Sequence, residues 1–237
     1  DYIYVLLTST VNFDSKLTTK TAQILRRSII SGINDYVSDE LYKFEQSFRL
    51  SKLQSKIDNT DNSILGNDTS IRLNKRFEPT LNQKLSYNLK FNNAIFHPHS
   101  GHMGSINSTK FTINDEQDIS RDGCEFKDKD GAVKIVRTDN EGNEITVREN
   151  TGTIDYITGK ISINSFDPSA YQGDYISITV IPVLNDVKSL REQLITIEEK
   201  DINLQMNDVS LVVTGSQVTT TESTTSTGTV QTTSVNY

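Results

Sequence analysis

The chain has 237 residues, enough for one large domain or two small ones, and its hydrophobic content of 34% favours an extended shape or burial against partners. Its formal net charge of −7 disfavours binding to nucleic-acid phosphates. It has no apolar run of about 18 residues, so no membrane-spanning helix is expected, and its single cysteine, Cys124, excludes an internal disulfide or a cysteine-based zinc site.

The first part of the chain is expected to hold one strand followed by two helices. Tyr2–Thr8 is rich in β-branched and aromatic residues, which predicts a buried strand. Over Thr21–Phe48 apolar residues recur at three- and four-residue spacing, which predicts a long amphipathic helix. Ser51 is expected to cap a second, short helix. The apolar stripe of the long helix contains Ile29, Ile33, Tyr36, Val37, Leu41, Phe44 and Phe48.

The apolar spacing changes to two after Ser63, which predicts strands. Ile71, Leu73 and Phe77 alternate with polar residues, except where Lys75 interrupts the pattern. A second alternating run lies between residues 85 and 91. One strand, two helices and further strands predict an α+β module over residues 1–92, in which the helices cover one face of a small sheet.

Residues 93–110 are predicted to form a linker loop that contains all three histidines, His97, His99 and His102. Their spacing suggests a metal site because imidazole is a ligand for zinc and nickel. A structural zinc ion takes four ligands, however, and only three are offered here, with no cysteine nearby. We therefore expect a structural turn with histidines bonded to the backbone, and neither a metal nor a cofactor.

Residues 111–213 are predicted to form an all-β module. Short β-branched segments are separated by turn sequences such as Lys129-Asp130-Gly131, and strands so close in sequence favour a meander or a sandwich. The acidic run at Asp128 is similar to a calcium-binding loop, but its register fails because Phe126 and Arg137 stand at ligand positions. We interpret it as a hairpin turn.

The last segment, residues 214–237, is dominated by serine and threonine. This composition predicts a disordered linker or mucin-like stalk without a core of its own. Threonine and valine favour extended backbone, so we expect a partner to hold the segment by strand addition.

The sequence offers no catalytic motif. It contains neither a Gly-x-Ser-x-Gly elbow nor a glycine-rich phosphate loop. Ser100 and His102 are close in sequence, but triad residues seldom are. Paired carboxylates such as Glu198-Glu199 are more often a solvated surface than a pair of catalytic acids. We therefore expect that the protein is not an enzyme.

Three stretches carry a family resemblance. The first runs from Ile33 to Phe44 and continues through Phe48–Leu53 to Ile57-Asp58; the second joins Ser63-Ile64-Leu65 to Thr69–Leu73; the third is Gly152–Ile161. In this order they resemble the C-terminal portion of a baseplate wedge protein of T-even-type contractile-tailed phages, an inner-ring subunit related to the J-like baseplate proteins.

The resemblance implies a non-enzymatic, late protein of the virion tail, assembled in the host cytoplasm and present in two copies per wedge. Its implied partners are a second copy of itself and other baseplate wedge proteins, with no nucleic acid and no membrane. The chain begins at Asp1 in a strand-like run, so we expect it to be part of a longer protein.

The predicted fold class is therefore α+β, with a helix-plus-small-sheet module, an all-β meander or sandwich module and a Ser/Thr-rich extended tail. The alternative function is a carbohydrate-binding module of a tail fibre or adhesin, which a Ser/Thr-rich stalk would suit. The helices and the absence of tryptophan argue against it, because sugar sites usually stack aromatic side chains. The residues expected to form packing surfaces in the assembly are Ile29, Ile33, Tyr36, Leu41, Phe44, Phe48, Tyr156 and Ile161.

Overall fold

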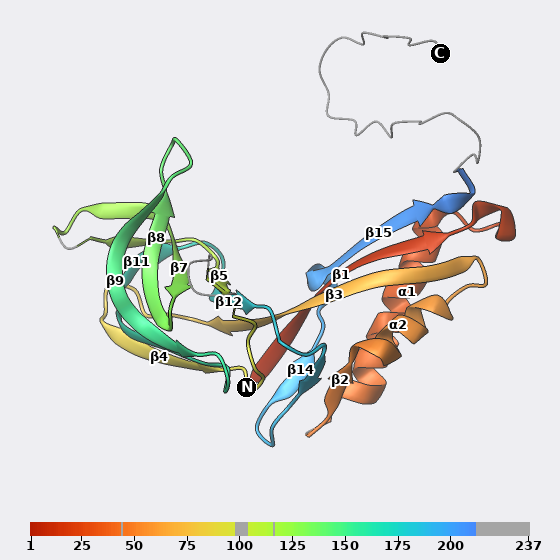
Figure 1. Ribbon diagram of the computed structural model, residues 1–237, viewed down its shortest axis with the longest axis horizontal. Coiled ribbons are helices and arrows are strands. Elements are labelled where there is room, and N and C mark those ends of the chain that lie inside the picture. Colours follow the sequence, from red (N-terminus) through yellow and green to blue (C-terminus); the bar gives the residue numbers. More distant parts are fainter. Residues whose placement is uncertain (44, 98–103, 116, 212–237) are drawn as a thin grey trace, which may run out of the picture.

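The structure, a computed structural model, describes residues 1–43, 45–97, 104–115 and 117–211. In these residues the chain forms two lobes, which Figure 1 shows side by side with the N-terminus between them. One lobe is a sheet covered by two helices, and the other is a curved sheet that forms a half-barrel.

The first sheet is built around β1, which runs antiparallel to β3 on one side and parallel to β14 and β15 on the other. Beyond β3 follow β12 and then β5. Every second residue of β1 is buried, as a period of two requires when one face of a sheet is covered. The strands are β1 (Tyr2–Phe13), β3 (Ile64–Phe77), β5 (Ile106–Ser108), β12 (Ile176–Val180), β14 (Leu194–Thr196) and β15 (Ile202–Asp208), and a separate pair is β2 (Ser47–Arg49) with β13 (Asp186–Lys188).

Two helices cover one face of this sheet. α1 (Ala22–Tyr36) begins after Thr21, whose hydroxyl oxygen accepts a hydrogen bond from the Ile24 amide at 3.3 Å. α2 (Leu50–Asp58) packs between α1 and β3. Each leucine or isoleucine that the helices bury against the sheet contributes roughly 1.5–3 kcal/mol. Short helical turns are η1 (Ser15–Leu17), η3 (Glu199–Asp201) and η4 (Val209–Leu211).

The helix expected over residues 21–48 is shorter than predicted. α1 ends at Tyr36, and the chain continues as one π-helical turn, η2 (Val37–Leu41), closed by a hydrogen bond from the Tyr42 amide to the Val37 carbonyl. Glu45 has a φ of 61°, a left-handed conformation that a right-handed helix excludes. Phe48 is then part of β2. The apolar spacing continues past the helix end because the π turn and β2 also bury side chains in the same core.

The second sheet has seven strands in the order β11–β6–β7–β8–β9–β10–β4. Its interior contains Phe111, Phe126 and Phe166, whose ring centroids lie 4.8, 4.9 and 5.0 Å apart, within the range of favourable aromatic pairs. The Asn82 amide donates a hydrogen bond to the Pro168 carbonyl at 2.9 Å, which brings the loop before β4 to β11. The strands are β4 (Leu85–Lys90), β6 (Phe111–Asn114), β7 (Ser120–Lys129), β8 (Ala132–Thr138), β9 (Glu144–Asp155), β10 (Lys160–Phe166) and β11 (Pro168–Tyr171).

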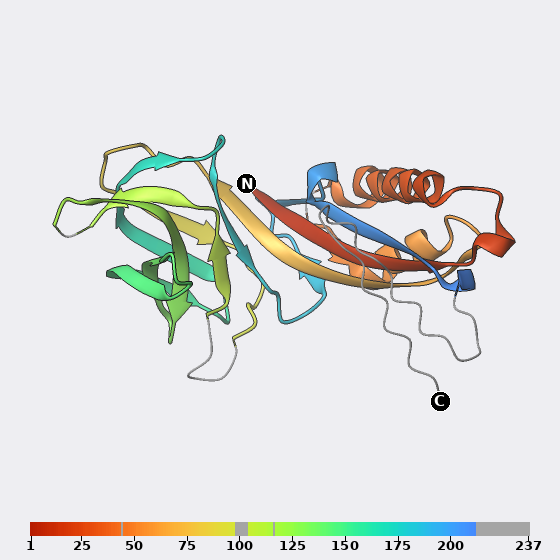
Figure 2. The ribbon, with the colours of Figure 1, turned by 90° about the horizontal axis from the view of Figure 1, so that it is seen from above.

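The two lobes are joined by β3 and β12. β3 is 14 residues long, and Figures 1 and 2 show it running from the helix-covered sheet toward the half-barrel. β12 pairs with the last part of β3, with Ile176 opposite Phe77 and Val180 opposite Leu73. Ile95 and Pro182 add an isolated bridge between the segments that leave β4 and β12. The junction is therefore made of paired backbone rather than of a single flexible linker.

The predicted α+β fold class is wrong. Strands take up 50% of the protein and helices 18%, which fits an all-β fold better than a helix-plus-sheet module followed by a separate meander or sandwich. The error arises because strands were grouped with their sequence neighbours, whereas β12, β14 and β15 join the sheet of β1.

The predicted domain ranges 1–92, 93–110 and 111–213 stay a prediction, and the Ser/Thr-rich tail over 214–237 lies outside the described residues. None of the helices in the described part of the chain is both long and apolar enough to cross a membrane.

Candidate functional site

The predicted helix stripe lies inside the core of the helix-covered lobe. Tyr36 is 6% exposed, and its hydroxyl oxygen accepts a hydrogen bond from the Arg49 amide at 3.3 Å, which links α1 to β2. Phe44 lies outside the described residues. The described side chains of the stripe pack inside the lobe and fix its shape. Their role as a packing surface toward partners stays a prediction. The fully buried members of the stripe are Ile29, Ile33, Leu41 and Phe48.

The predicted hairpin around Tyr156 and Ile161 contains a buried polar contact. Ile161 is fully buried, and the Tyr156 hydroxyl donates a hydrogen bond of 2.6 Å to the Asp128 carboxylate, which is 2% exposed. The second carboxylate oxygen accepts a hydrogen bond from the Ile106 amide at 2.7 Å. Burial and the bond to Asp128 raise the pKa of Tyr156 well above its ordinary value. A Cβ atom at Gly104 would overlap the Asp128 carbonyl oxygen, so the site requires glycine there.

The buried carboxylate was not predicted, although the spacing of apolar residues in β7 indicates it. Cys124 and Phe126 face the interior of the half-barrel, and Asp128 follows them at the same spacing of two. The sequence KDKDG predicts the turn itself, where Asp130 and Gly131 have φ values of 49° and 86° and form the hairpin between β7 and β8. The tip of the next hairpin exposes Ile157, of which 84% is accessible to solvent.

A buried lysine lies where the lobes meet. Lys75, on β3, is 2% exposed, and its ammonium group donates to the Asp1 carboxylate at 2.5 Å. The Gln193 side-chain amide donates to the same carboxylate oxygen at 3.0 Å and to the Lys90 carbonyl at 2.7 Å. Burial lowers the pKa of Lys75 to about 8, even with the Asp1 carboxylate beside it. The interruption of the alternating pattern at this position was the sequence signal for the contact.

Arg76, the next residue of β3, forms a second junction contact. Its guanidinium group makes ion pairs of 2.7 Å with Glu198 and with Asp201, which lie ahead of β15. It also lies 3.5 Å from the ring centroid of Tyr4 on β1 and 4.8 Å from that of Tyr175, next to β12. One side chain therefore ties β1 and β3 to the segments that precede β12 and β15.

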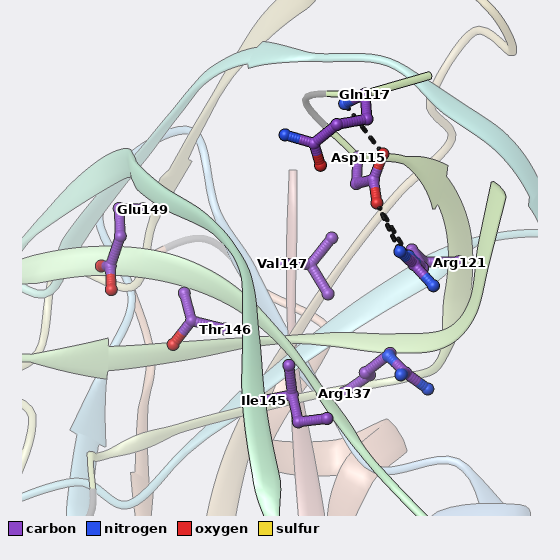
Figure 3. A pocket seen from close by; sticks show the side chains of 8 residues that line it. All are labelled: Asp115, Gln117, Arg121, Arg137, Ile145, Thr146, Val147 and Glu149. Atoms are coloured by element: carbon purple, nitrogen blue, oxygen red, sulfur yellow. Dashed lines mark hydrogen bonds and ion pairs between the residues drawn. The ribbon is translucent and has the colours of Figure 1, made fainter. Parts of the chain in front are cut away.

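A shallow pocket of about 400 Å³ lies on the half-barrel. In it the Asp115 carboxylate accepts hydrogen bonds from the Arg121 guanidinium at 2.8 Å and from the Gln117 amide at 2.9 Å (Figure 3). Arg137 and Glu149 line the pocket from β8 and β9 with opposite charges. Among the described residues, the lining includes no histidine, serine or cysteine. The Asp115 carboxylate closes the turn between β6 and β7 by accepting a hydrogen bond from the Ile119 backbone amide, which is a structural contact.

The predicted histidine loop is described only in part. The His97 ring centroid lies 4.0 Å from that of Tyr156, so this histidine packs on the hairpin. His99 and His102 lie outside the described residues. Within the described residues, no group of three or more His, Cys, Asp or Glu side chains is arranged to hold a metal ion.

The segment that contains β1, both helices and most of β3 matches a known protein family. Residues 1–76 match the family described as baseplate structural protein gp6, C-terminal domain III. The match supports a phage baseplate structural protein. No curated protein matches the chain.

The matched range contains β1, both helices and all of β3 except Phe77. Two of the three stretches that carried the sequence resemblance fall within it, and Gly152–Ile161 lies beyond it. A baseplate structural protein is part of the virion tail and contacts other baseplate proteins. The family also suggests a structural, non-enzymatic role.

Proposed function

We propose that this chain is a structural subunit of a baseplate wedge that forms part of the inner baseplate ring, by dimerising and by contacting other wedge proteins. The single observation that carries the proposal is the match of residues 1–76 to the gp6 C-terminal domain III family. The match gives the carbohydrate-binding alternative no support, and that alternative is not favoured.

The architecture supports a mechanical role for the subunit. β3 contributes to the helix-covered sheet and continues to the junction, where the buried side chain of Lys75 and the largely buried side chain of Arg76 pair with partly exposed carboxylates. Because paired strands and charge-assisted hydrogen bonds resist bending, displacement of one lobe would move the other with it. A ring subunit with this property holds its position and passes on a conformational change.

Within this proposal, the helix stripe and the hairpin both contribute to the surfaces that partner proteins contact. The stripe acts from inside the lobe, because its described members are buried. The hairpin presents Ile157 directly, and an isoleucine that is 84% exposed adds apolar area to any partner that covers it.

Location in the particle tests the function directly. We expect electron microscopy of assembled baseplates that carry a labelled copy of this chain to place the label in the inner ring, twice per wedge. A label at a distal, exposed tip would contradict the proposal and would support the carbohydrate-binding alternative.

The hairpin contact has its own test. The substitution Ile157→Asp places a charge at the exposed tip, and we expect it to weaken co-purification with the other wedge proteins by about tenfold, because burying an unpaired charge is costly. The matched control is Ile119→Asp, at an isoleucine that is 49% exposed at the turn between β6 and β7. Equal effects of both variants would show that the hairpin is not the contact.

A further inference from the structure

β15 is an edge strand with one side unpaired by the described chain. It pairs with β1 over seven residues, Leu7 to Phe13 opposite Ile202 to Asp208, and no other strand in the described residues pairs with its second side. Figure 1 shows β15 as the outermost strand beside β1, and Figure 2 views the molecule from that edge. An unpaired edge presents a row of N–H and C=O groups that can add another strand.

The sequence and pairing of this edge lack several features that usually protect such strands. Proteins commonly place lysine, proline or a bulge on an exposed edge, or keep the edge strand short. β15 contains no lysine, arginine or proline, and its register with β1 is unbroken. The other edge strands of the two large sheets are shorter, at three residues for β5 and β14, four for β11 and six for β4, which ends on Lys90.

The backbone of β15 is already used by a side chain from outside the ladder. The Arg26 guanidinium, on α1, donates a hydrogen bond of 3.4 Å to the Leu204 carbonyl. In a strand, alternate residues direct their backbone groups to opposite neighbours, so the carbonyl of Met206 points to the same side as that of Leu204. Strand addition at this edge would replace the Arg26 bond, which at 3.4 Å is long, by a backbone donor of the added strand.

We propose that the β15 edge pairs antiparallel with the same edge of a second copy of this chain, with Gln205 on the two-fold axis. The inference rests on the proposed dimerisation and assigns it a surface. Antiparallel ladders require opposite residues of the same orientation, and a two-fold axis at the central residue pairs all seven positions. Any other centre pairs fewer of them.

The sequence of β15 is complementary to itself in this register. The two-fold axis sets Leu204 opposite Met206 of the second copy, which is an apolar pair, and Asn203 opposite Asn207, which is an amide pair. Gln205 lies opposite Gln205 of the second copy. Asn203, Gln205 and Asn207 are exposed on the face of the sheet that the helices leave open, so their side chains meet without rearranging the core.

Repulsion between like charges does not oppose the pairing of the two β15 strands. Asp208 is the only charged residue of β15 and stands at its end, opposite Ile202 of the second copy. Its carboxylate accepts hydrogen bonds from the Ser15 amide at 3.2 Å and the Ser210 amide at 3.0 Å, so it is held within its own subunit. Like charges therefore do not lie opposite each other anywhere in the seven paired positions.

The two-fold register predicts a charge-swap result. In Gln205→Lys two lysines face each other across the axis, and in Gln205→Glu two glutamates do so. For the full chain we expect each variant alone to dimerise at least about tenfold more weakly than wild type in sedimentation equilibrium, and an equimolar mixture of the two to recover wild-type affinity. The control is Ser70→Lys, an exposed residue on the same face of the central strand β3, which should leave dimerisation unchanged.

Each other outcome overturns the proposal, and the outcomes separate it from the proposed function. A dimer that is insensitive to both Gln205 charges refutes the β15 edge and leaves dimerisation through another surface standing. Weak single variants without recovery in the mixture refute the two-fold register at Gln205. A wild-type chain that stays monomeric refutes this edge and the proposed self-association together. Circular dichroism of each variant separates loss of pairing from loss of fold, because Gln205 is exposed.

Discussion

Removing the Tyr156 hydroxyl tests whether the buried carboxylate holds the half-barrel together. Tyr156→Phe keeps the aromatic ring and its packing on His97 but deletes the 2.6 Å hydrogen bond to Asp128. The Gly131 amide, which donates to the same hydroxyl oxygen at 3.3 Å, also loses its acceptor. Asp128 retains only the Ile106 amide among these partners.

The expected loss follows from the burial of Asp128. At 2% exposure, water cannot replace the missing donor, and a hydrogen bond to a charged group is worth about 1.5–3 kcal/mol. With the weaker contact to Gly131 included, we expect Tyr156→Phe to lower the free energy of unfolding by about 2–3 kcal/mol. For a chain of this size this corresponds to a fall in Tm of roughly 4–12 °C.

Urea denaturation at pH 7, followed by circular dichroism, measures this change. The control is Tyr87→Phe, whose hydroxyl oxygen accepts a neutral hydrogen bond from the exposed Thr80 amide at 3.2 Å, and we expect a loss below about 1 kcal/mol there. A double-mutant cycle with Asp128→Asn isolates the pair. The reasoning is refuted if Tyr156→Phe costs no more than the control, or costs the same whether position 128 is Asp or Asn.

Two further predictions concern the core and the junction. Ile33→Ala removes a fully buried side chain of α1 and should destabilise the protein by about 2–5 kcal/mol in the same assay, whereas Ile24→Ala, at a position 46% exposed on the same helix, should change stability by less than about 0.5 kcal/mol. Lys75 should make stability rise with pH. Its pKa is about 8 in the folded protein and 10.5 without burial, so the unfolded state binds more protons between these values. Between pH 8 and about 9.5 this group should add about 1.5 kcal/mol of stability, and Lys75→Met should abolish that increase.

A specific result would contradict each of these two predictions. If Ile33→Ala and Ile24→Ala lowered the free energy of unfolding by similar amounts, Ile33 would not be packed in the core. For the lysine, stability is compared with that of Lys75→Met at each pH, which cancels the titration of all other groups. The free energy of unfolding of wild type minus that of Lys75→Met should rise from pH 8 to 9.5, and a difference that stays constant or falls over this range would contradict the assigned direction of the pKa shift.

Local sequence patterns predicted many elements of the protein. The alternation between residues 85 and 91 corresponds to β4, and the turn at Asp130-Gly131 corresponds to the β7–β8 hairpin. The positions of α1 and α2 were also predicted, because one stripe of each helix must be apolar when one side is covered. Such patterns depend only on residues a few positions apart, so they are visible in the chain itself.

Only the tertiary structure determined which strands pair. β1 lies beside β15 although about two hundred residues separate them in sequence, and β3 lies between β1 and β12. Periodicity identifies a strand and its buried face but carries no information about its neighbour, so the strands were assigned to the wrong sheets and the fold class was wrong. The helix end at Tyr36 escaped detection for a related reason, since the core accepts apolar side chains from any backbone conformation.

For the polar contacts too, the sequence gives local patterns, and the tertiary structure decides the partners. Sequence analysis noted that Lys75 breaks an alternating pattern, whereas the burial of Asp128, two residues after Phe126, was not predicted. Their partners, Asp1 and Tyr156, are 74 and 28 positions away, and only the folded chain brings them within hydrogen-bond distance. The sequence by itself thus showed an interrupted pattern at Lys75, and only the tertiary structure decided that Lys75 and Asp128 are buried and which partner each one has, because the pairing of distant strands fixes which side chains share an interior.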